Sequence, residues 1–467
     1  MGFTLTTYGA AQEVTGSCHY LTNGKHRILL DCGLHQGQDA VKRLRKETFS
    51  FRPSTIDAVV LSHAHLDHSG LLPKLVRKGF RGPIYCSGAT RNLLAIMLED
   101  AARIYFRDLE HQNLRKKRAG KKIQEAEYSL DDVLRVLKHC VPVDYGHTRA
   151  LVDGVSLQFH DAGHILGSSI VELTLSAGDS TKTLVFSGDL GNSDSVLMPE
   201  PVVPDHADFV LMESTYGNRD HRPFAQTLEE LEQVLSAAWN DRGVVLMPAF
   251  SVGRTQELLY HLGCFFHRGK LDGWQVFIDS PMAIEVTQLY DQWLETLAKT
   301  EQKALEHYGA RTLEQFLPTL SLTPEVHDSM ALNRIDRGAI IIAGSGMCNG
   351  GRIRHHFKHR LWKDNTHVVF SGYQARGTLG RQLVDGQKNV RMFGERYAVH
   401  AQIHTLGGFS AHAGRTQLLK WAGGIGGNPR FRLVHGETEA LTALAHALRE
   451  QGREVSIAEP QSEYALE

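Results

Sequence analysis

The chain has 467 residues, which is too many for one ordinary hydrophobic core, so two domains are expected. Its formal net charge is −1, with 42% hydrophobic and 22% charged residues, which is typical of a globular protein and excludes a uniformly basic nucleic-acid-binding chain. The six cysteines are widely spaced without a C-x-x-C pair, which argues against a cysteine zinc site and fits the reducing cytoplasm. No apolar stretch indicates a signal peptide or a membrane span.

The N-terminal part is predicted to consist of short strands and turns. Three strand-like segments lie within residues 4–30, and Asn23-Gly24 predicts a tight hairpin turn between the last two. Asp31 follows the third segment and lies next to a glycine. Two interpretations of Asp31 stay open: a surface turn residue, or a carboxylate that orients a metal-bound histidine.

The most informative stretch is residues 62–68, which read SHAHLDH and follow a strand-like apolar segment. In an extended chain, residues two apart face the same side, so His63 and His65 can bind one metal ion. Asp67 and His68 lie where the chain turns into a predicted helix and can reach a second ion. This ligand set is compatible with zinc or manganese. Chance clustering among 26 histidines is the alternative, but three imidazoles and a carboxylate in six residues favour a metal site.

Residues 88–139 are predicted to be mostly helical and contain a concentrated basic stretch. Six positive charges fall within eight residues, namely Arg115, Lys116, Lys117, Arg118, Lys121 and Lys122. One interpretation is a solvated helix face or a mobile loop. The other is a local patch that attracts phosphate, which a chain without net positive charge would need for a polyanionic substrate.

Three later segments repeat the geometry of a polar side chain at the end of a buried strand. His164 lies among small residues at a strand-to-loop junction, Asp189 follows an apolar strand within the sequence SGDLG, and Glu213 follows the strand-like sequence FVLM. Each side chain alone is unremarkable. Together they are candidate ligands that could converge with the histidine cluster.

Beyond Glu213, strands and helices alternate through residue 370, which predicts a parallel sheet flanked by helices, a domain in its own right. Two glycine-rich segments follow strands there and are either plain tight turns or contacts for a backbone phosphate. Their candidate phosphate contacts are Ser345, Gly346, Arg352, Ser371 and Thr378. After residue 395 the first pattern returns, with His412 in FSAHA and His435 at the end of a strand.

The pattern His-x-His-x-Asp-His, a later lone histidine, Gly-Asp-x-Gly and a histidine near the end resembles the metallo-β-lactamase superfamily. The sequences ESTY, FSAH and VHGE, and the interrupting α/β segment, resemble its β-CASP nuclease branch. The resemblance implies an α/β fold, a metallo-β-lactamase αββα sandwich with an inserted β-CASP domain. The implied domains are residues 1–208 and 396–467, the two parts of the metallo-β-lactamase domain, and 209–395, the β-CASP domain.

The resemblance also implies a site with two zinc ions, Mn²⁺ being an alternative. The implied ligands form two groups, His63, His65 and His164 in one and Asp67, His68 and His435 in the other, with Asp189 bridging both. The implied catalytic residues are Asp67, Asp31, Glu213 and His412. Among them Asp31 is a supporting carboxylate, and Glu213 orients His412, which could protonate the leaving 3′-oxygen as a general acid.

The implied function is zinc-dependent hydrolysis of single-stranded RNA by hydroxide that two metal ions activate, leaving 5′-phosphate and 3′-hydroxyl ends. An endonuclease is expected, with 5′ exonuclease activity as an option. His435 favours RNA, because DNA-directed members of the branch tend to have an aliphatic residue there. The expected location is the cytoplasm, without a membrane partner, and the oligomeric state is left open, with a homodimer among the options.

Three other functions fit the sequence less well. A thioester or lactone hydrolase of the same superfamily would need neither the long insert nor Glu213 and His412. A non-enzymatic partner of an active nuclease fits poorly with seven intact candidate ligands. A redox di-iron protein would be expected to carry a flavin domain, for which the sequence has no pattern.

Overall fold

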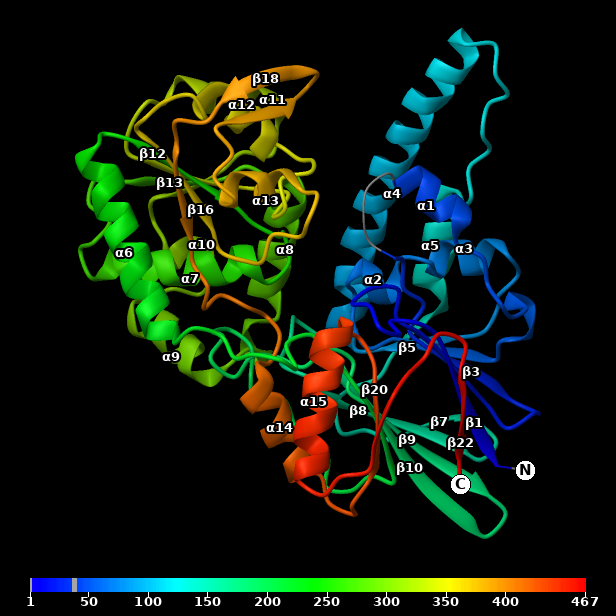
Figure 1. Cartoon of the computed structure of the whole chain (residues 1–467). Coiled ribbons are helices and arrows are strands. Elements are labelled where there is room, and N and C mark those ends of the chain that lie inside the picture. The colour runs from blue at the N-terminus through cyan, green and yellow to red at the C-terminus, as the bar shows by residue number, and fades with distance from the viewer. Residues whose placement is uncertain (1, 36–39) are drawn as a thin grey trace. The chain divides into compact units, whose positions relative to one another are not determined.

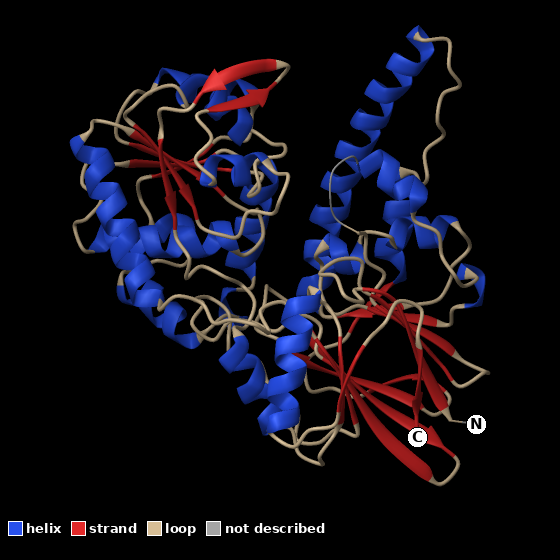
Figure 2. Ribbon diagram, viewed as in Figure 1, coloured by secondary structure: helices blue, strands red, loops and turns tan. Residues whose placement is uncertain are grey.

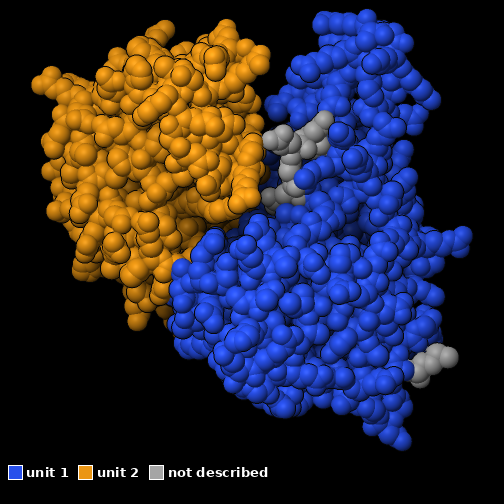
Figure 3. All heavy atoms as spheres, in the orientation of Figure 1, with its two compact units in different colours: residues 1–193, 200–220, 412–467 blue, residues 194–199, 221–411 orange. Residues whose placement is uncertain are grey.

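The computed structural model describes residues 2–35 and 40–467. It divides into two compact units, which Figure 3 colours separately. Unit 1 comprises Met1–Ser193, Glu200–Asp220 and His412–Glu467, and unit 2 comprises Asp194–Pro199 and His221–Ala411. Unit 2 is therefore an insertion in the chain of unit 1. The predicted domain boundaries at residues 209 and 396 stay a prediction.

Unit 1 contains two seven-stranded sheets (Figure 2). In order across the first sheet, the strands are β22 (Glu463–Leu466), β1 (Phe3–Gly9), β2 (Cys18–Thr22), β3 (Arg27–Leu30), β4 (Ala58–Val60), β5 (Ile84–Cys86) and β6 (Cys140–Pro142). In order across the second, they are β21 (Val455–Ile457), β20 (Arg430–Leu433), β11 (Phe209–Met212), β10 (Ser180–Phe186), β9 (Ser169–Ala177), β8 (Val155–Asp161) and β7 (Arg149–Val152).

The two sheets of unit 1 pack face to face, because apolar residues of both lie in one buried cluster. Leu5 and Ile28 of the first sheet belong to it together with Leu157 and Val171 of the second. The other face of the second sheet is covered by α14 and α15, through a further apolar cluster. The helices of unit 1 are α1 (Ala40–Lys46), α2 (Leu66–Ser69), α3 (Leu72–Arg77), α4 (Gly88–Arg118), α5 (Leu130–His139), α14 (Arg415–Gly424) and α15 (Thr438–Glu450), with the 3-10 turn η1 (Pro53–Thr55).

Unit 2 is built on a six-stranded sheet whose pairings are all parallel, as the alternating pattern predicted. In order, its strands are β14 (Leu320–Leu322), β13 (Gln275–Ile278), β15 (Ala339–Ala343), β12 (Val244–Pro248), β16 (Thr366–Phe370) and β19 (Gln402–Thr405), and β17 (Asn389–Met392) pairs with β18 (Glu395–Ala398) in a separate hairpin. The helices are α6 (Phe224–Asn240), α7 (Arg254–His267), α8 (Pro281–Gln292), α9 (Lys299–His307), α10 (Leu313–Phe316), α11 (Val326–Ala331), α12 (Ile353–Arg360) and α13 (Leu379–Val384), with the 3-10 turns η2 (Leu294–Thr296) and η3 (Leu332–Arg334).

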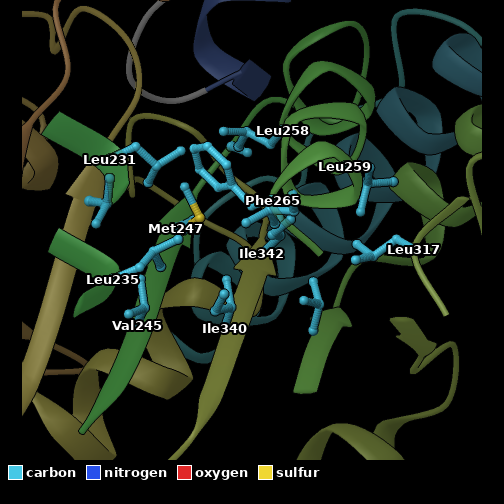
Figure 4. Packing of buried hydrophobic residues seen from close by; sticks show 14 of the residues in the cluster. Leu231, Leu235, Val245, Met247, Leu258, Leu259, Phe265, Leu317, Ile340 and Ile342 are labelled. Atoms are coloured by element: carbon cyan, nitrogen blue, oxygen red, sulfur yellow. The ribbon is translucent and has the colours of Figure 1, made fainter. Parts of the chain in front are cut away.

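The central strands β12 and β15 of this sheet are continuously apolar because both faces are covered by helices. Val245 and Met247 of β12 point to the cluster that contains α6 and α7, which Figure 4 shows from close by. Leu246, between them, belongs to the opposite cluster with Phe357 of α12 and Leu383 of α13. Side chains on a strand alternate between faces, so each residue of β12 stabilises one of the two layers.

One detail differs from the prediction. The helix that was predicted to follow the turn at Asp67 and His68 begins earlier, because α2 starts at Leu66, inside the histidine cluster, and α3 follows separately at Leu72. The predicted fold class, a two-sheet sandwich with an inserted parallel sheet, is confirmed. None of the helices in the described part of the chain is long and apolar enough to cross a lipid bilayer.

Candidate metal centre

The histidine cluster changes conformation in its middle. Strand β4 ends at Val60, and the chain then passes through a short loop with bends at Ser62, Ala64 and His65, the last of which is the residue before the first turn of α2. Asp67 and His68 lie in that short helix. His63 and His65 of the loop belong to one group of candidate ligands, and Asp67 and His68 of the helix belong to the other, so one local sequence supplies both groups.

The first place is formed by His63, His65, His164 and Asp189, whose ligand atoms all lie within 4.8 Å of one another. The Nδ1 atom of His65 lies 3.1 Å from Nε2 of His63 and 3.2 Å from Nε2 of His164. The Oδ2 atom of Asp189 lies 3.5 and 3.6 Å from the same two Nε2 atoms. Three imidazole nitrogens and one carboxylate oxygen make a donor set that zinc accepts.

The second place is formed by Asp67, His68 and His435, again within 4.8 Å of one another. Here the Oδ1 atom of Asp189 lies 3.4 Å from Nε2 of His68 and 3.5 Å from Nδ1 of His435. Asp189 therefore presents one carboxylate oxygen to each group of ligands. All seven residues that the sequence suggested come together, although they come from α2 and four separate loops.

Three buried atoms of this cluster that lack a hydrogen-bond partner in the described part of the chain indicate whether a cation fits there. Nε2 of His68, Oδ1 of Asp189 and Nε2 of His435 are buried and have no hydrogen-bond partner among the described residues. Buried polar atoms are normally paired, because an unpaired one costs about 1–3 kcal/mol. Three such atoms in one cluster of imidazoles and carboxylates are explained by a bound metal ion, so the residues present fit a metal.

The protonation states favour metal binding at the first place. Burial, with like charge from a neighbouring imidazole, lowers the pKa of His63 and of His65 well below the usual value, so both rings are neutral. Burial by itself would raise the pKa of Asp189, but the imidazoles of His435 and His68 outweigh it and hold that pKa well below its usual range. Metal ligands must be unprotonated, and these three are.

Asp31 lies directly behind the second place and is fully buried, which excludes the surface-turn interpretation. Nδ1 of His68 donates to its Oδ2 at 2.7 Å, and the backbone N–H of Ser62 donates to its Oδ1 at 2.8 Å. The backbone of Asp31 has φ 61°, a left-handed conformation that is uncommon for residues other than glycine. The carboxylate therefore orients His68 so that Nε2 faces the metal place.

Replacing Asp31 by asparagine is expected to weaken zinc binding about 10- to 100-fold at the second place while the chain stays folded, because His68 loses its anionic partner. Titration with a zinc chelator of known affinity measures this, and circular dichroism monitors the fold. Asp153→Asn is the matched control, since the Asp153 side chain is 87% exposed. Equal zinc affinity in both variants would remove the orienting role of Asp31.

Hydroxyl groups support the histidines in a way that the sequence did not reveal. Oγ of Ser62 lies 3.1 Å from Nδ1 of His63 and donates to Asp31, and Oγ of Ser17 also donates to Asp31 at 3.0 Å. Oγ1 of Thr215 lies 3.2 Å from Nδ1 of His435. Ser62 and Thr215 lie within the motifs SHAHLDH and ESTY, which is a weak signal, whereas Ser17 has no such signal.

Glu213 and His412 form a pair beside the first place. The fully buried carboxylate of Glu213 accepts from the backbone N–H of Leu190 at 2.6 Å and from Nδ1 of His412 at 3.3 Å. The N–H of Ala413 bonds to the carbonyl of Leu190 at 2.8 Å, which fixes the segment that carries His412. Burial opposes protonation, but Glu213 and Asp189 raise the pKa of His412 to about 9. The His412 side chain is 23% exposed, so it can be reached from solvent.

The five candidate phosphate contacts all lie in unit 2, and several already have partners within the unit. The guanidinium of Arg352 donates to Asp279 at 2.8 Å and to two backbone carbonyls. Oγ of Ser345 bonds across its own glycine-rich loop, and Thr378 caps the start of α13. Ser371 is buried, and a side chain at Gly346 would contact the ring of Phe250. Their contact with phosphate stays a prediction.

Three comparisons with known proteins agree with this geometry. Residues 11–241 match the metallo-beta-lactamase superfamily, residues 255–383 the Beta-Casp domain, and residues 396–458 the Zn-dependent metallo-hydrolase RNA specificity domain. The chain is 41% identical over 455 residues to Ribonuclease TTHA0252 of Thermus thermophilus, covering 97% of this chain and 98% of that protein. It is 32% identical over 455 residues to Transcription termination factor FttA of Methanocaldococcus jannaschii, covering 94% and 68%.

A solved structure shows a related fold. It belongs to a protein of unknown function from Enterococcus faecalis V583 and has a TM-score of 0.56 at 13% sequence identity, with full coverage of both chains. At that identity the likeness concerns the fold alone.

Proposed function

The chain belongs to the β-CASP family of metallo-β-lactamase-fold metal-dependent hydrolases, and from that premise we propose that it is a zinc-dependent ribonuclease acting on single-stranded RNA. The observation that carries the proposal is Asp189, whose two oxygens face two separate groups of histidines. A relative that spans nearly the whole chain is named a ribonuclease, which supports RNA as the substrate.

We assign two Zn²⁺ ions per chain, Mn²⁺ being the alternative. His63, His65 and His164 would hold one ion, Asp67, His68 and His435 the other, and Asp189 both. When bound, such a pair of ions supplies an activated water and neutralises the charge of a phosphodiester. Asp31, Ser62 and Thr215 lie behind the ligands and would orient the rings of His68, His63 and His435.

The proton for the leaving 3′-oxygen would come from His412. Its Nδ1 donates to Glu213, so Nε2 is the ring atom that can deliver a proton to a substrate. Glu213 in turn stabilises the protonated ring, because its buried carboxylate carries the opposite charge. Cleavage in this direction leaves a 5′-phosphate and a 3′-hydroxyl.

The deciding assay incubates the enzyme with 5′-labelled single-stranded RNA and, separately, with a thioester. We expect cleavage of the RNA, with 5′-phosphate ends on the products. A chelator should abolish this cleavage, and added zinc should restore it. Ends that carry a 2′,3′-cyclic phosphate would contradict the mechanism, since they require attack by the RNA itself. Thioester turnover without RNA cleavage would assign the site to a small-molecule hydrolase. Long RNA with and without a 5′-phosphate separates endonuclease from 5′ exonuclease activity.

We propose the cytoplasm as the location. All six cysteines are free thiols, and five of them are buried. Unpaired cysteines are typical of a reducing compartment.

A further inference from the structure

The long helix α4 starts at the metal centre and carries the basic stretch at its other end. The side chains of Ser87 and Thr90, at its N-terminus, both donate to the carbonyl of Gly167 at 2.7 Å, three residues after the candidate ligand His164. The buried residues of α4 end at Leu109. At 1.5 Å per residue, 31 residues span about 46 Å. Figure 1 shows the C-terminal part of α4 projecting beyond the other helices of unit 1.

The end of this helix is an ordered structure and not a loose loop. Gly120 has φ 63° and ends the helix, with the N–H of Lys121 bonded to the carbonyl of Lys116 at 2.9 Å. The side chain of Asn113 then bonds to both the N–H and the carbonyl of Gln124, each at 2.8 Å. These two bonds fasten the returning chain to the helix. We call residues 115–122 the α4 tip.

The α4 tip holds cations without acidic partners. In the part of the chain that the structure describes, none of its side chains has a hydrogen bond or an ion pair, and all but the half-buried Lys116 are exposed; the six cations are Arg115, Lys116, Lys117, Arg118, Lys121 and Lys122. Nearer the core, by contrast, Arg103 pairs with Glu99 and Arg107 lies 3.9 Å from Asp108. One or two cations suffice to complement the dipole of a helix end. Six mutually repelling charges therefore lower stability unless an anion neutralises them.

We propose that the α4 tip binds the phosphate backbone of the RNA substrate, well away from the bond that is cleaved. The inference rests on the ribonuclease function proposed above. A stacked strand rises about 3.4 Å per nucleotide, so the length of α4 corresponds to about 13 nucleotides. The tip would thus favour long RNA over short RNA without sequence preference, because phosphate contacts carry no sequence information.

The charge and composition of the α4 tip favour RNA over a protein partner or a membrane surface. The α4 tip itself has no large apolar side chain, and the exposed ones that flank it in the sequence are Leu114 and Ile123. A protein partner would need an apolar contact area with a buried centre, and a membrane surface would need a continuous apolar helix face. Closely spaced cations without such an area match a phosphate backbone.

The test compares two double variants on the same helix, Lys117→Gln/Arg118→Gln in the tip and Arg103→Gln/Arg107→Gln as the matched control. The tip variant should bind a 30-nucleotide RNA about tenfold more weakly, measured by fluorescence anisotropy in a His412→Ala background. The dependence of log Kd on log salt should become shallower by about 0.7 for each lost contact. In the active enzyme, KM for the long RNA should rise, whereas kcat and the KM for a 5-nucleotide RNA should not change.

Several outcomes would overturn the inference. One is an equal loss of affinity in both double variants, and another is unchanged binding of the long RNA by the tip variant. A third is loss of binding to polyglutamate or to phosphatidylserine vesicles with RNA binding intact, which would assign the tip to another partner. RNA that binds through the tip but is never cleaved contradicts the proposed function and leaves this inference standing. If RNA is cleaved and the tip variant binds and cleaves it as the parent does, this inference is wrong and the proposed function stands.

Discussion

Replacing His412 by alanine is expected to reduce RNA cleavage about 10²- to 10⁴-fold, the usual contribution of a general acid. The metal centre should survive, because all seven candidate ligands are retained in this variant. Nδ1 of His412 lies 3.3 Å from Glu213 and 4.0 Å from Asp189, and the segment is also fixed through the backbone of Ala413. The measurements are the initial rate on single-stranded RNA and the number of zinc ions per chain by mass spectrometry.

The matched control is His446→Ala, since the His446 side chain is 73% exposed and pairs with Glu450 on its own helix. It should keep both the rate and the zinc. Glu213→Gln should lose most of the rate as well, because the amide neither stabilises the charged ring nor accepts its proton as strongly. If His412→Ala loses zinc together with activity, then His412 is a ligand or a structural residue, and the acid role is wrong.

Replacing Asp189 by asparagine is expected to lower the zinc content from two ions per chain to one or fewer and to abolish RNA cleavage. One oxygen of Asp189 faces His63 and His164, and the other faces His68 and His435. An amide offers one weak oxygen ligand and one N–H₂ group, which cannot bind a cation, so one group of ligands loses its carboxylate completely. The shared negative charge that the two cations need is lost as well.

Stability gives a readout of the same change that does not depend on activity. A metal that binds only the folded chain stabilises it by about 4 kcal/mol when its concentration is a thousand times Kd. Adding a chelator should therefore lower Tm markedly in the parent and only slightly in Asp189→Asn. Asp208→Asn, at a partly exposed carboxylate in the same unit, should behave as the parent. Two tightly held zinc ions in Asp189→Asn would contradict the bridging role.

Much of the fold follows from local patterns in the sequence. The continuous apolar runs around Val245 and Ile341 predict strands that are covered on both faces, and their alternation with helices predicts a parallel sheet. The cluster of His63, His65 and His68 predicts a metal site, because ligand type and close spacing are properties of neighbouring residues. The sequence alone thus determined the type of each layer and the ligands that lie within one loop.

The tertiary structure decided which distant residues meet. Asp31 and His68 are 37 residues apart, and His435 is 220 residues from Thr215, yet each pair shares a hydrogen bond because β3 pairs with β4 in one sheet and β11 pairs with β20 in the other. Arg352, a candidate for substrate contact, is instead bonded to Asp279, 73 residues earlier. Such contacts, and the nearby imidazoles that hold the pKa of Asp189 low against the effect of burial, arise from packing between segments. No local pattern contains them, because the hydrophobic contacts that create them join parts of the chain that are far apart in the sequence.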